Sequence, residues 1–360
     1  MSNQPPYQPP PVRKLVVWIG GSSGVGYAAL ESLLATGGSF NIVLGSRSQL
    51  EPWRYGQLQP SLKSSNSYLD VMDCDLTRYG SVWTFAEAIK TKYAEPIDAL
   101  VLCAGKISAR YHRTSDGQEE TLQVNVLSHA LLMDLLAPKL GVNGTPCRIL
   151  MVTSSLHRSV PERTISPENI DEVLSNQFDP MQVYHITKLL QIFLMHMAQE
   201  RFDADKRLVT VVAVSPGYIP DTGLTRELGR LKSGLSYYLM SHAPFATPIP
   251  DGGRTICRGI TQNFPGGTYF SQRKVENTAE ETYNMELRQA WKGWFIWKNV
   301  WKPEAPPPPM APGMSAIPAL GHADSNGQPG IAPGPAPQIP GQQQGPPQMP
   351  MAPGHQGSYS

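Results

Sequence analysis

The chain has 360 residues, of which 40% are hydrophobic, and its 30 lysines and arginines nearly balance 29 aspartates and glutamates. This length and apolar content suffice for one large hydrophobic core. A net charge of +1 excludes the basic surface that a nucleic-acid partner requires. The four cysteines match neither a disulfide scaffold nor a metal site, so we expect no metal and a reducing, cytoplasmic environment.

The two ends of the chain lack the residues that build a core. Residues 1–12 are rich in proline and glutamine and do not resemble a signal peptide. Residues 303–360 are rich in proline, glycine and glutamine, and they bury too little apolar surface to offset the entropy of ordering. We therefore expect two disordered ends around one folded domain at residues 13–302. No transmembrane segment is expected, because no apolar run reaches the roughly 20 residues that span a bilayer.

Residues 15–19 form a short apolar run that predicts a buried parallel strand. The run leads into a glycine-rich turn and then into a leucine-rich helical pattern. Glycines let the backbone approach a pyrophosphate, whose charge meets exposed N–H groups and the positive end of the helix. The turn thus predicts a dinucleotide phosphate site, with a ligand-free turn as the alternative. The expected site residues are Gly20, Ser22, Ser23, Gly24, Val25 and Gly26.

The next two predicted strands end in residues that suit the adenosine half of a dinucleotide. Arg47 follows the strand at residues 41–44, where an arginine suits the 2′-phosphate of NADP(H) and an acidic residue would suit NAD(H). A solvated loop arginine is the alternative. Asp75 and Leu76 follow the strand at residues 68–73. Asp75 is placed either to receive the adenine amino group or to cap the next helix.

A helix at residues 79–93 precedes a fourth predicted strand at residues 98–102. This strand ends at Cys103, Ala104 and Gly105, whose small side chains let a flat ring pass close to the backbone or simply form a tight turn.

The long helical pattern at residues 117–140 is interrupted by Asn125, which either serves structure or holds a water in the site. A fifth strand at residues 149–153 ends in Ser154 and Ser155, at the edge where open α/β sheets bind ligands.

A polar connection at residues 156–180 leads to a helix that carries Tyr184 and Lys188 and continues to about Phe202. The two side chains are four residues apart and therefore lie on one helix face. A nearby cation lowers the pKa of a phenol, which is ordinarily about 10, toward a useful range. The pair suits proton transfer at an alcohol or ketone oxygen, although an ordinary half-exposed helix face is the alternative.

A sixth predicted strand at residues 208–214 is followed by Pro216 and Gly217. The alternation of strands and helices predicts an α/β fold, a single Rossmann-type doubly wound parallel sheet. Residues 219–245 are expected to form a flap over the site. The aromatic cluster from Trp291 to Trp301 predicts core packing, with a substrate pocket or a peripheral membrane contact as alternatives.

Taken in order, these motifs resemble the short-chain dehydrogenase/reductase family over nearly all of residues 14–285. The segments around Asn125, Ser155 and Pro216 are most similar to the retinol-dehydrogenase-like branch and to fungal reductases of secondary-metabolite ketones. Ile19 and Cys103 depart from the family's pattern, which has Thr and Asn there, and this concerns cofactor affinity more than chemistry. The motifs that carry the resemblance are Gly20-x-x-x-Gly24-x-Gly26, Asp75-Leu76, Asn125, Ser155, Tyr184-x-x-x-Lys188 and Pro216-Gly217.

The resemblance implies a role for each motif. Tyr184 would protonate the carbonyl oxygen, and Lys188 would hold the nicotinamide ribose and lower the pKa of Tyr184. Ser155, which aligns better than Ser154 with the family's second serine, would bond the oxyanion. Asn125 would anchor a water that returns the proton to Lys188. The expected NADP(H) contacts are the glycine-rich turn, Arg47, Asp75, Leu76, Ala104, Gly105, Asn125, Tyr184, Lys188, Pro216 and Gly217.

Three functions are compatible with this set of residues. The first is NADPH-dependent reduction of a ketone or aldehyde on a lipophilic or secondary-metabolite substrate. The second is NADP-dependent oxidation of a retinol- or steroid-like alcohol. The third is a non-catalytic NADP(H)-sensing module whose proline-rich tail docks a partner. The family's dimers often use the two long helices, so a homodimer is open as well.

Overall fold

The computed structural model describes residues 12–161, 165–176, 178–220, 224, 246–272 and 274–303. The expected disordered ends therefore fall almost entirely outside the described residues. The same holds for most of the expected flap at residues 219–245.

An eight-stranded sheet forms the centre of the described chain, in the strand order β3-β2-β1-β4-β5-β6-β7-β8. The first seven strands are parallel, and β8 pairs antiparallel with β7. The chain builds the sheet outward from β1 to β3 and then crosses back to β4 on the other side of β1. This confirms the doubly wound fold. The strands are β1 (Lys14–Ile19), β2 (Phe40–Ser46), β3 (Tyr68–Asp73), β4 (Ala99–Leu102), β5 (Cys147–Val152), β6 (Val209–Ser215), β7 (Thr268–Ser271) and β8 (Lys274–Val275).

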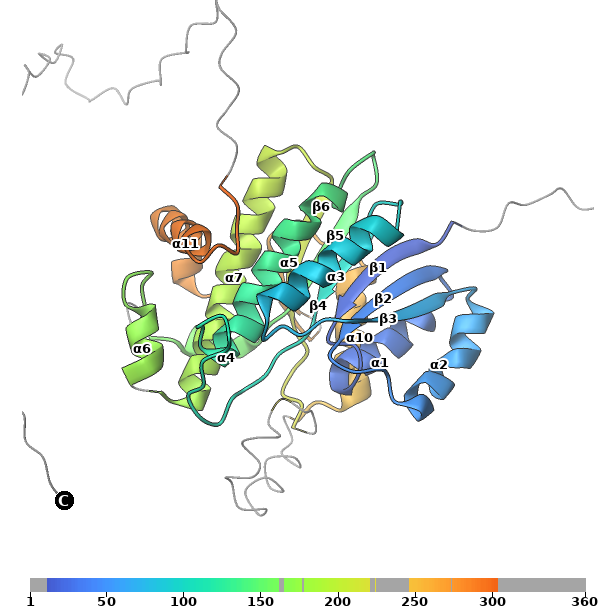
Figure 1. The fold of residues 1–360 in the computed structure, drawn as a ribbon, viewed down its shortest axis with the longest axis horizontal. Helices are drawn as coiled ribbons and strands as arrows, with labels where there is room; N and C mark the ends of the chain where they lie inside the picture. Colours follow the sequence, from blue (N-terminus) through green and yellow to red (C-terminus); the bar gives the residue numbers. More distant parts are fainter. Residues whose placement is uncertain are drawn as a thin grey trace, which may run out of the picture. The chain divides into compact units, whose positions relative to one another are not determined.

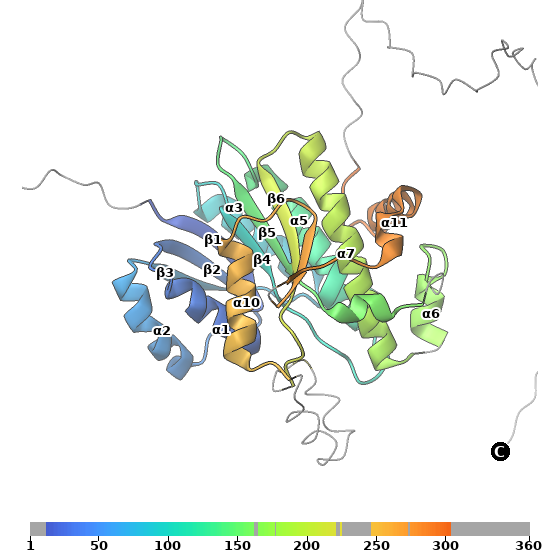
Figure 2. The same cartoon turned by 180° about the vertical axis from the view of Figure 1, so that it is seen from behind.

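Helices cover both faces of this sheet. Figure 1 shows α3 (Tyr79–Lys92), α5 (Ser128–Leu136) and α7 (Pro180–Ala204) in front of the strands. The view from behind shows α1 (Gly24–Leu34) and α10 (Ile249–Thr261) on the opposite face (Figure 2), with α2 (Pro52–Ser64) nearer the β3 edge. Because both faces are covered, the central strands are apolar throughout. Along β1, Leu15 and Val17 belong to the core under α3, α5 and α7, and Val16 and Trp18 belong to the core under α1 and α10.

The predicted long helix at residues 117–140 is helical from Glu120 onward but is not a uniform α-helix. It consists of α4 (Glu120–Leu122), a π-helical turn (Gln123–Leu127), α5 and a 3-10 turn (Ala137–Lys139). The Glu119 carboxylate caps α4 by accepting from the backbone N–H groups of Thr121 and Leu122. The π turn contains Asn125, and π turns in α-helices are frequent at functional sites.

The connection expected to be irregular at residues 156–180 contains two short helices. A 3-10 turn spans Ser155–Ser159, and α6 spans Ile170–Asn176. Ile170 and Leu174, four residues apart, bury one face of α6, although the segment is too short to show a clear helical period in the sequence.

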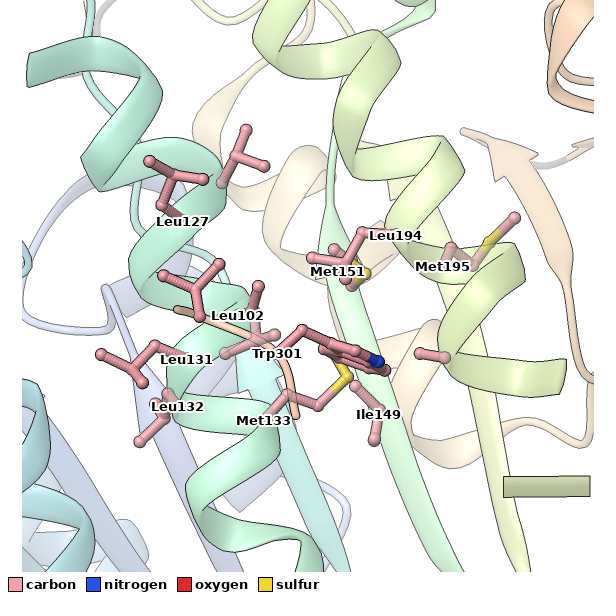
Figure 3. Close-up of a cluster of buried hydrophobic side chains, with 14 of the residues drawn as sticks. Leu102, Leu127, Leu131, Leu132, Met133, Ile149, Met151, Leu194, Met195 and Trp301 are labelled. Atoms are coloured by element: carbon pink, nitrogen blue, oxygen red, sulfur yellow. The ribbon is translucent and has the colours of Figure 1, made fainter. Parts of the chain in front are cut away.

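The aromatic segment near the end of the described chain packs against the core, as predicted. Helix α11 (Met285–Trp297) buries Trp291 against Phe193 of α7, with ring centres 5.9 Å apart. Figure 3 shows Trp301 among the side chains of Met133 on α5 and Ile149 on β5. Trp297 differs from the others, because 67% of it is exposed. Among the described helices, none is long and apolar enough to cross a membrane.

Candidate active site

A pocket of about 380 Å³ opens at the carboxyl ends of the parallel strands, where the strand order reverses at β1 and β4. Its walls come from the segments that follow β1 to β6. The structure brings nearly all the predicted site residues together here; Asn125 and Ser155 are the exceptions. The predicted residues that line the pocket are Gly20, Ser22, Ser23, Gly24, Val25, Gly26, Arg47, Asp75, Leu76, Ala104, Gly105, Tyr184, Lys188, Pro216 and Gly217.

The glycine-rich turn has the geometry of an anion cradle. Gly20 adopts a φ of +87°, and a Cβ there would overlap the backbone nitrogen of Ala104. A Cβ on Gly26 would overlap the carbonyl oxygen of Gly20. Glycine is thus required at both positions. Helix α1 begins at Gly24, so its first N–H groups and its positive end face the pocket, which suits a pyrophosphate.

The end of the pocket that follows β2 and β3 holds Arg47 and Asp75. Arg47 is exposed just beyond β2. The Asp75 carboxylate accepts hydrogen bonds from the backbone N–H and hydroxyl of Thr77, at 3.0 and 2.8 Å, and pairs with Arg78. Burial raises the pKa of Asp75, but these bonds outweigh burial and hold that pKa below its usual value. Asp75 thus fixes the turn before α3 but does not cap that helix, whose first backbone N–H, on Tyr79, donates to Asp116.

Tyr184 and Lys188 lie together on the buried face of α7, as their spacing predicted. The Lys188 ammonium donates to the Val152 carbonyl at 3.1 Å and to Oε1 of Gln191 at 3.0 Å. It lies 5.2 Å from the centre of the Tyr184 ring. Burial lowers the pKa of Lys188 to about 8, with a small opposing effect of Cys103.

The expected lowering of the Tyr184 pKa by Lys188 is not seen in the described structure. Burial raises the pKa of Tyr184, and a hydrogen bond with Ser154 only partly opposes this rise. The physical reason is that the phenolate loses its hydration in this site, while the Lys188 ammonium is directed to the Val152 carbonyl and Gln191.

The structure brings Ser154 to the pocket beside Tyr184, and its hydroxyl oxygen accepts from the backbone N–H of Leu156 at 3.3 Å. Ser155, the serine preferred from the sequence, is exposed and lies outside the pocket lining. Its backbone N–H donates to Ser215, and it begins the 3-10 turn that follows β5. The turn rotates consecutive side chains to different directions, and the sequence alone does not show which serine faces inward.

Asn125 is fully buried behind the pocket wall. Its side-chain oxygen accepts from the backbone N–H of Lys106 at 2.8 Å, and its side-chain nitrogen donates to the Lys106 carbonyl at 3.0 Å and to Thr187 at 3.1 Å. Asn125 thus joins the loop after β4 to α7. This contact is of the structural kind, one of the two roles that the sequence left open for Asn125.

Gln191 is a buried polar residue beside Lys188 that the sequence patterns do not single out. Its side-chain nitrogen donates to the backbone carbonyl of Asn125 at 2.8 Å, while its oxygen accepts from Lys188. A polar residue within the apolar run Leu189–Met195, one helical turn after Lys188, was the signal available in the sequence.

The two departures from the family pattern leave the turns intact. The backbone N–H groups of Cys103 and Ala104 both donate to the Ile19 carbonyl, at 2.9 and 3.0 Å. These bonds do not depend on the side chains at Ile19 and Cys103. Burial raises the pKa of the Cys103 thiol to about 12, so the thiol is neutral.

The short chain dehydrogenase family model matches residues 14–164. The short-chain dehydrogenase/reductase ffsI of Aspergillus flavipes is 31% identical over 270 residues, which cover 72% of this chain and 75% of that protein. The chain belongs to the short-chain dehydrogenase/reductase family. It is accordingly an oxidoreductase acting on CH–OH and C=O groups.

Two further proteins are similar to this short-chain dehydrogenase/reductase. Polyprenol dehydrogenase of Homo sapiens is 27% identical over 297 residues, which cover 79% of this chain and 84% of that protein. The crystal structure of NADPH-bound carbonyl reductase from chicken fatty liver shares the fold, with a TM-score of 0.52 at 16% identity, covering 74% of this chain and 99% of that chain.

An apolar wall stands beside Tyr184 in this dehydrogenase/reductase. Ile107 and Tyr184 form a small buried cluster that is separate from the two main cores. Leu156 and Leu224 pack against it from two other segments, and Met181 packs against it from α7, the helix that carries Tyr184. The side of the pocket nearest Tyr184 is therefore apolar.

Proposed function

We propose that the protein uses NADPH to reduce a ketone or aldehyde on an apolar molecule to an alcohol. The observation that carries this proposal is the position of the Tyr184 phenol. It lies in the same pocket as the glycine-rich cradle, beside Ser154 and an apolar wall. A proton donor, an anion site and an apolar surface in one pocket are what this reaction requires.

The cofactor proposal rests on the residues of the pocket. The turn at Gly20 and Gly26 has no room for a Cβ, and this close approach of the backbone suits a pyrophosphate. The planar guanidinium of Arg47 suits a 2′-phosphate. The NADPH-bound carbonyl reductase of chicken fatty liver, which shares the fold, supports this choice. Pro216 and Gly217 after β6, with Ala104 and Gly105 after β4, would flank the nicotinamide. When bound, NADPH supplies the hydride.

Each catalytic side chain has a separate task in this proposal. Tyr184 gives its proton to the carbonyl oxygen as that oxygen gains negative charge. Ser154, rather than Ser155, donates a hydrogen bond to the same oxygen. Lys188, whose ammonium lies 5.2 Å from the centre of the Tyr184 ring, would hold the nicotinamide ribose.

Oxidation of an apolar alcohol is the second candidate function. The similarity to human polyprenol dehydrogenase over most of both chains favours a long apolar alcohol as its substrate. The same residues serve this direction, with Tyr184 accepting the proton. The non-catalytic sensing module receives less support, because Tyr184, Lys188 and Ser154 all line the pocket. The cytoplasmic location expected from the sequence stays a prediction.

The test measures turnover in both directions with the full chain. NADPH is supplied with decanal, acetophenone or cyclohexanone, and NADP+ is supplied with the matching alcohols or with a polyprenol. We expect consumption of NADPH with an apolar carbonyl compound and weak activity when NADH replaces NADPH. Tight NADPH binding without turnover of any of these compounds would favour the sensing module.

Tyr184→Phe is the first variant to examine in this assay. We expect the variant to fold and bind NADPH normally, and its turnover to fall by about 100-fold or more, because the phenyl ring has no proton to give. Tyr79→Phe is the matched control: the Tyr79 hydroxyl has no hydrogen-bond partner in the described part of the chain. Turnover near the wild-type rate in Tyr184→Phe would remove the phenol from the mechanism.

A further inference from the structure

The side chain of His157 holds the 3-10 turn after β5 from the inside. His157 is 0% exposed, and its ring Nδ1 lies 2.7 Å from the backbone carbonyl oxygen of Ser154. The backbone N–H of His157 donates to the same oxygen at 3.1 Å. A carbonyl only accepts hydrogen bonds, so the ring carries its hydrogen on Nδ1. His157 therefore places two donors on one carbonyl, where a 3-10 turn alone supplies only its backbone N–H.

The ring of His157 is neutral and packs against the sheet. Burial lowers the pKa of His157 to about 4, and the opposing effects of the Ser154 carbonyl and Glu276 are smaller. The ring meets that of Tyr269 on β7 edge to face, with centres 4.8 Å apart. The guanidinium of Arg158 lies 5.1 Å from the centre of the same Tyr269 ring and pairs with Glu276 at 3.1 Å. The turn is thus fixed to β7 as well as to its own carbonyl.

This turn determines where the Ser154 hydroxyl points. Ser154 precedes the turn, and its side-chain oxygen accepts from the backbone N–H of Leu156. A hydroxyl that accepts one bond keeps its own hydrogen to donate, and Ser154 and Tyr184 both line the pocket. Burial raises the pKa of Tyr184, and the Ser154 hydroxyl opposes that rise. Because the Ser154 carbonyl and the Leu156 N–H belong to one turn, a bond that fixes the carbonyl also fixes the hydroxyl.

We propose that His157 is a positioning residue, whose Nδ1–H bond to the Ser154 carbonyl holds the turn that directs the Ser154 hydroxyl toward Tyr184 and the reacting oxygen. The inference rests on the proposed function, in which Ser154 donates to the carbonyl oxygen that Tyr184 protonates. His157 is buried outside the pocket lining, so it acts through Ser154 and does not touch the substrate. A donor to a developing negative charge must be in place before the reaction, because a displaced donor loses much of its effect.

Two substitutions separate the hydrogen bond of His157 from its packing. His157→Asn keeps an N–H donor at the δ position, within reach of the Ser154 carbonyl, but leaves space beside Tyr269. His157→Phe keeps a ring against Tyr269 and has no donor. We expect His157→Asn to lose thermal stability but keep Ser154 in place, and His157→Phe to release Ser154. His196→Phe is the matched control, because His196 is a buried histidine further along α7 that packs 5.6 Å from the Tyr283 ring, outside the pocket lining.

The measurement is the NMR signal of the Tyr184 Cζ in full-length protein with isotope-labelled tyrosine, because this carbon responds to hydrogen bonds at the phenol oxygen. The signal is assigned by its loss in Tyr184→Phe, and Ser154→Ala gives its position without the Ser154 hydroxyl. We expect His157→Phe to move the signal toward its position in Ser154→Ala. His157→Asn and His196→Phe are expected to leave it unchanged. A wild-type signal in His157→Phe, or an equal displacement in His157→Asn, would overturn the proposal.

The signal needs no substrate, so it separates this proposal from the proposed reaction. If His157→Phe moves the signal but the wild type reduces no carbonyl compound, His157 positions Ser154 and the proposed reaction is wrong. With an active wild type, His157→Phe is expected to lower kcat about tenfold with little change in the KM for NADPH, because only the donor to the reacting oxygen is displaced. His157→Asn is expected to restore the wild-type kcat. Equal kcat values in His157→Phe and His196→Phe would contradict the positioning role.

Discussion

At the scale of single residues, the site combines exposed and buried charges that act differently. Arg47 lies exposed after β2, whereas Lys188 is buried on α7. An exposed cation recognises a ligand at little cost to folding. A buried cation alters both the chemistry and the stability of the fold.

Arg47→Ala is expected to weaken NADPH binding about tenfold or more and to leave NADH binding nearly unchanged, because only NADPH carries the 2′-phosphate. Fluorescence titration with both cofactors checks this. Arg13→Ala is the charge-matched control, because Arg13 precedes β1 at the opposite end of the strands, where it bonds to Asn66. Equal losses for NADPH and NADH in Arg47→Ala would mean that Arg47 does not select the cofactor.

The buried Lys188 is expected to make the stability of the cofactor-free protein rise with pH. Burial lowers the pKa of Lys188 from 10.5 to about 8. Below pH 8 both the folded and unfolded states hold the proton, and the buried charge weakens the fold. As the pH rises from 8 to 10.5, the folded state releases this proton before the unfolded state does, so the fold gains stability.

Lys188→Met removes this gain. Between about pH 7 and pH 10, the free energy of unfolding of the wild type is expected to rise by about 2 kcal/mol relative to the variant. Urea unfolding of both proteins at the two pH values measures the difference. Parallel pH dependence in the two proteins would show that Lys188 stays charged in the fold.

At the scale of elements, glycines determine how closely helices approach the turns and one another. Gly20→Ala is expected to destabilise the protein and abolish cofactor binding, because the added Cβ would overlap Ala104 at a φ of +87°. Gly56→Ala is the control: Gly56 lies inside α2 with open space around its Cβ position. That variant should gain about 1 kcal/mol. Thermal unfolding and NADPH titration compare the two variants. Normal NADPH binding by Gly20→Ala would show that the glycine-rich turn does not hold the pyrophosphate.

The way each element packs explains whether it could be predicted from the sequence. The central strands are continuous apolar runs because both faces are covered, so β1 to β6 were predicted within one or two residues. Helix α10 was missed because it contains Gly252 and Gly253, which lower helix propensity. A Cβ on Gly253 would meet the backbone of Ala28 at 2.7 Å, so tertiary packing against α1 requires the glycine that hides the helix.

The site shows a similar division between what the sequence contains and what only the structure gives. Spacing along one helix was enough to predict that Tyr184 and Lys188 share a face. The choice between Ser154 and Ser155 depends on the turn after β5, and the contact of Gln191 depends on the π turn across from α7. Neither geometry follows from local sequence patterns.

At the scale of the whole described domain, the segment from Met285 to Lys302 completes the core. Trp301 stacks under the guanidinium of Arg201 at 4.7 Å, and Arg201 pairs with Asp134 of α5 at 2.8 Å. Helix α11 also pairs Arg288 with Glu200 of α7 at 2.5 Å. This segment occupies part of the outer surface of α5 and α7, so a homodimer that uses the two long helices would have to leave that part free.

Trp301→Ala is expected to cost about 3–5 kcal/mol, because it removes a buried indole from between α5, β5 and α7. Trp297→Ala removes the same side chain from a position that is 67% exposed, and its effect should be within about 0.5 kcal/mol. Denaturant unfolding of both variants checks the contrast. Similar losses in the two variants would contradict the packing described for Trp301.

The position of Trp301 has a consequence for how the chain is made. Helix α7 ends at Ala204, but the aromatic segment that covers it begins only at Met285, 81 residues later. At a synthesis rate of about 5–20 residues per second, the apolar surface around Met133 and Phe193 waits roughly 4–16 s for its cover. During that interval the nascent chain presents a surface that chaperones bind and that other nascent chains can join. Translation speed between α7 and α11 therefore influences how much of the protein reaches its folded form.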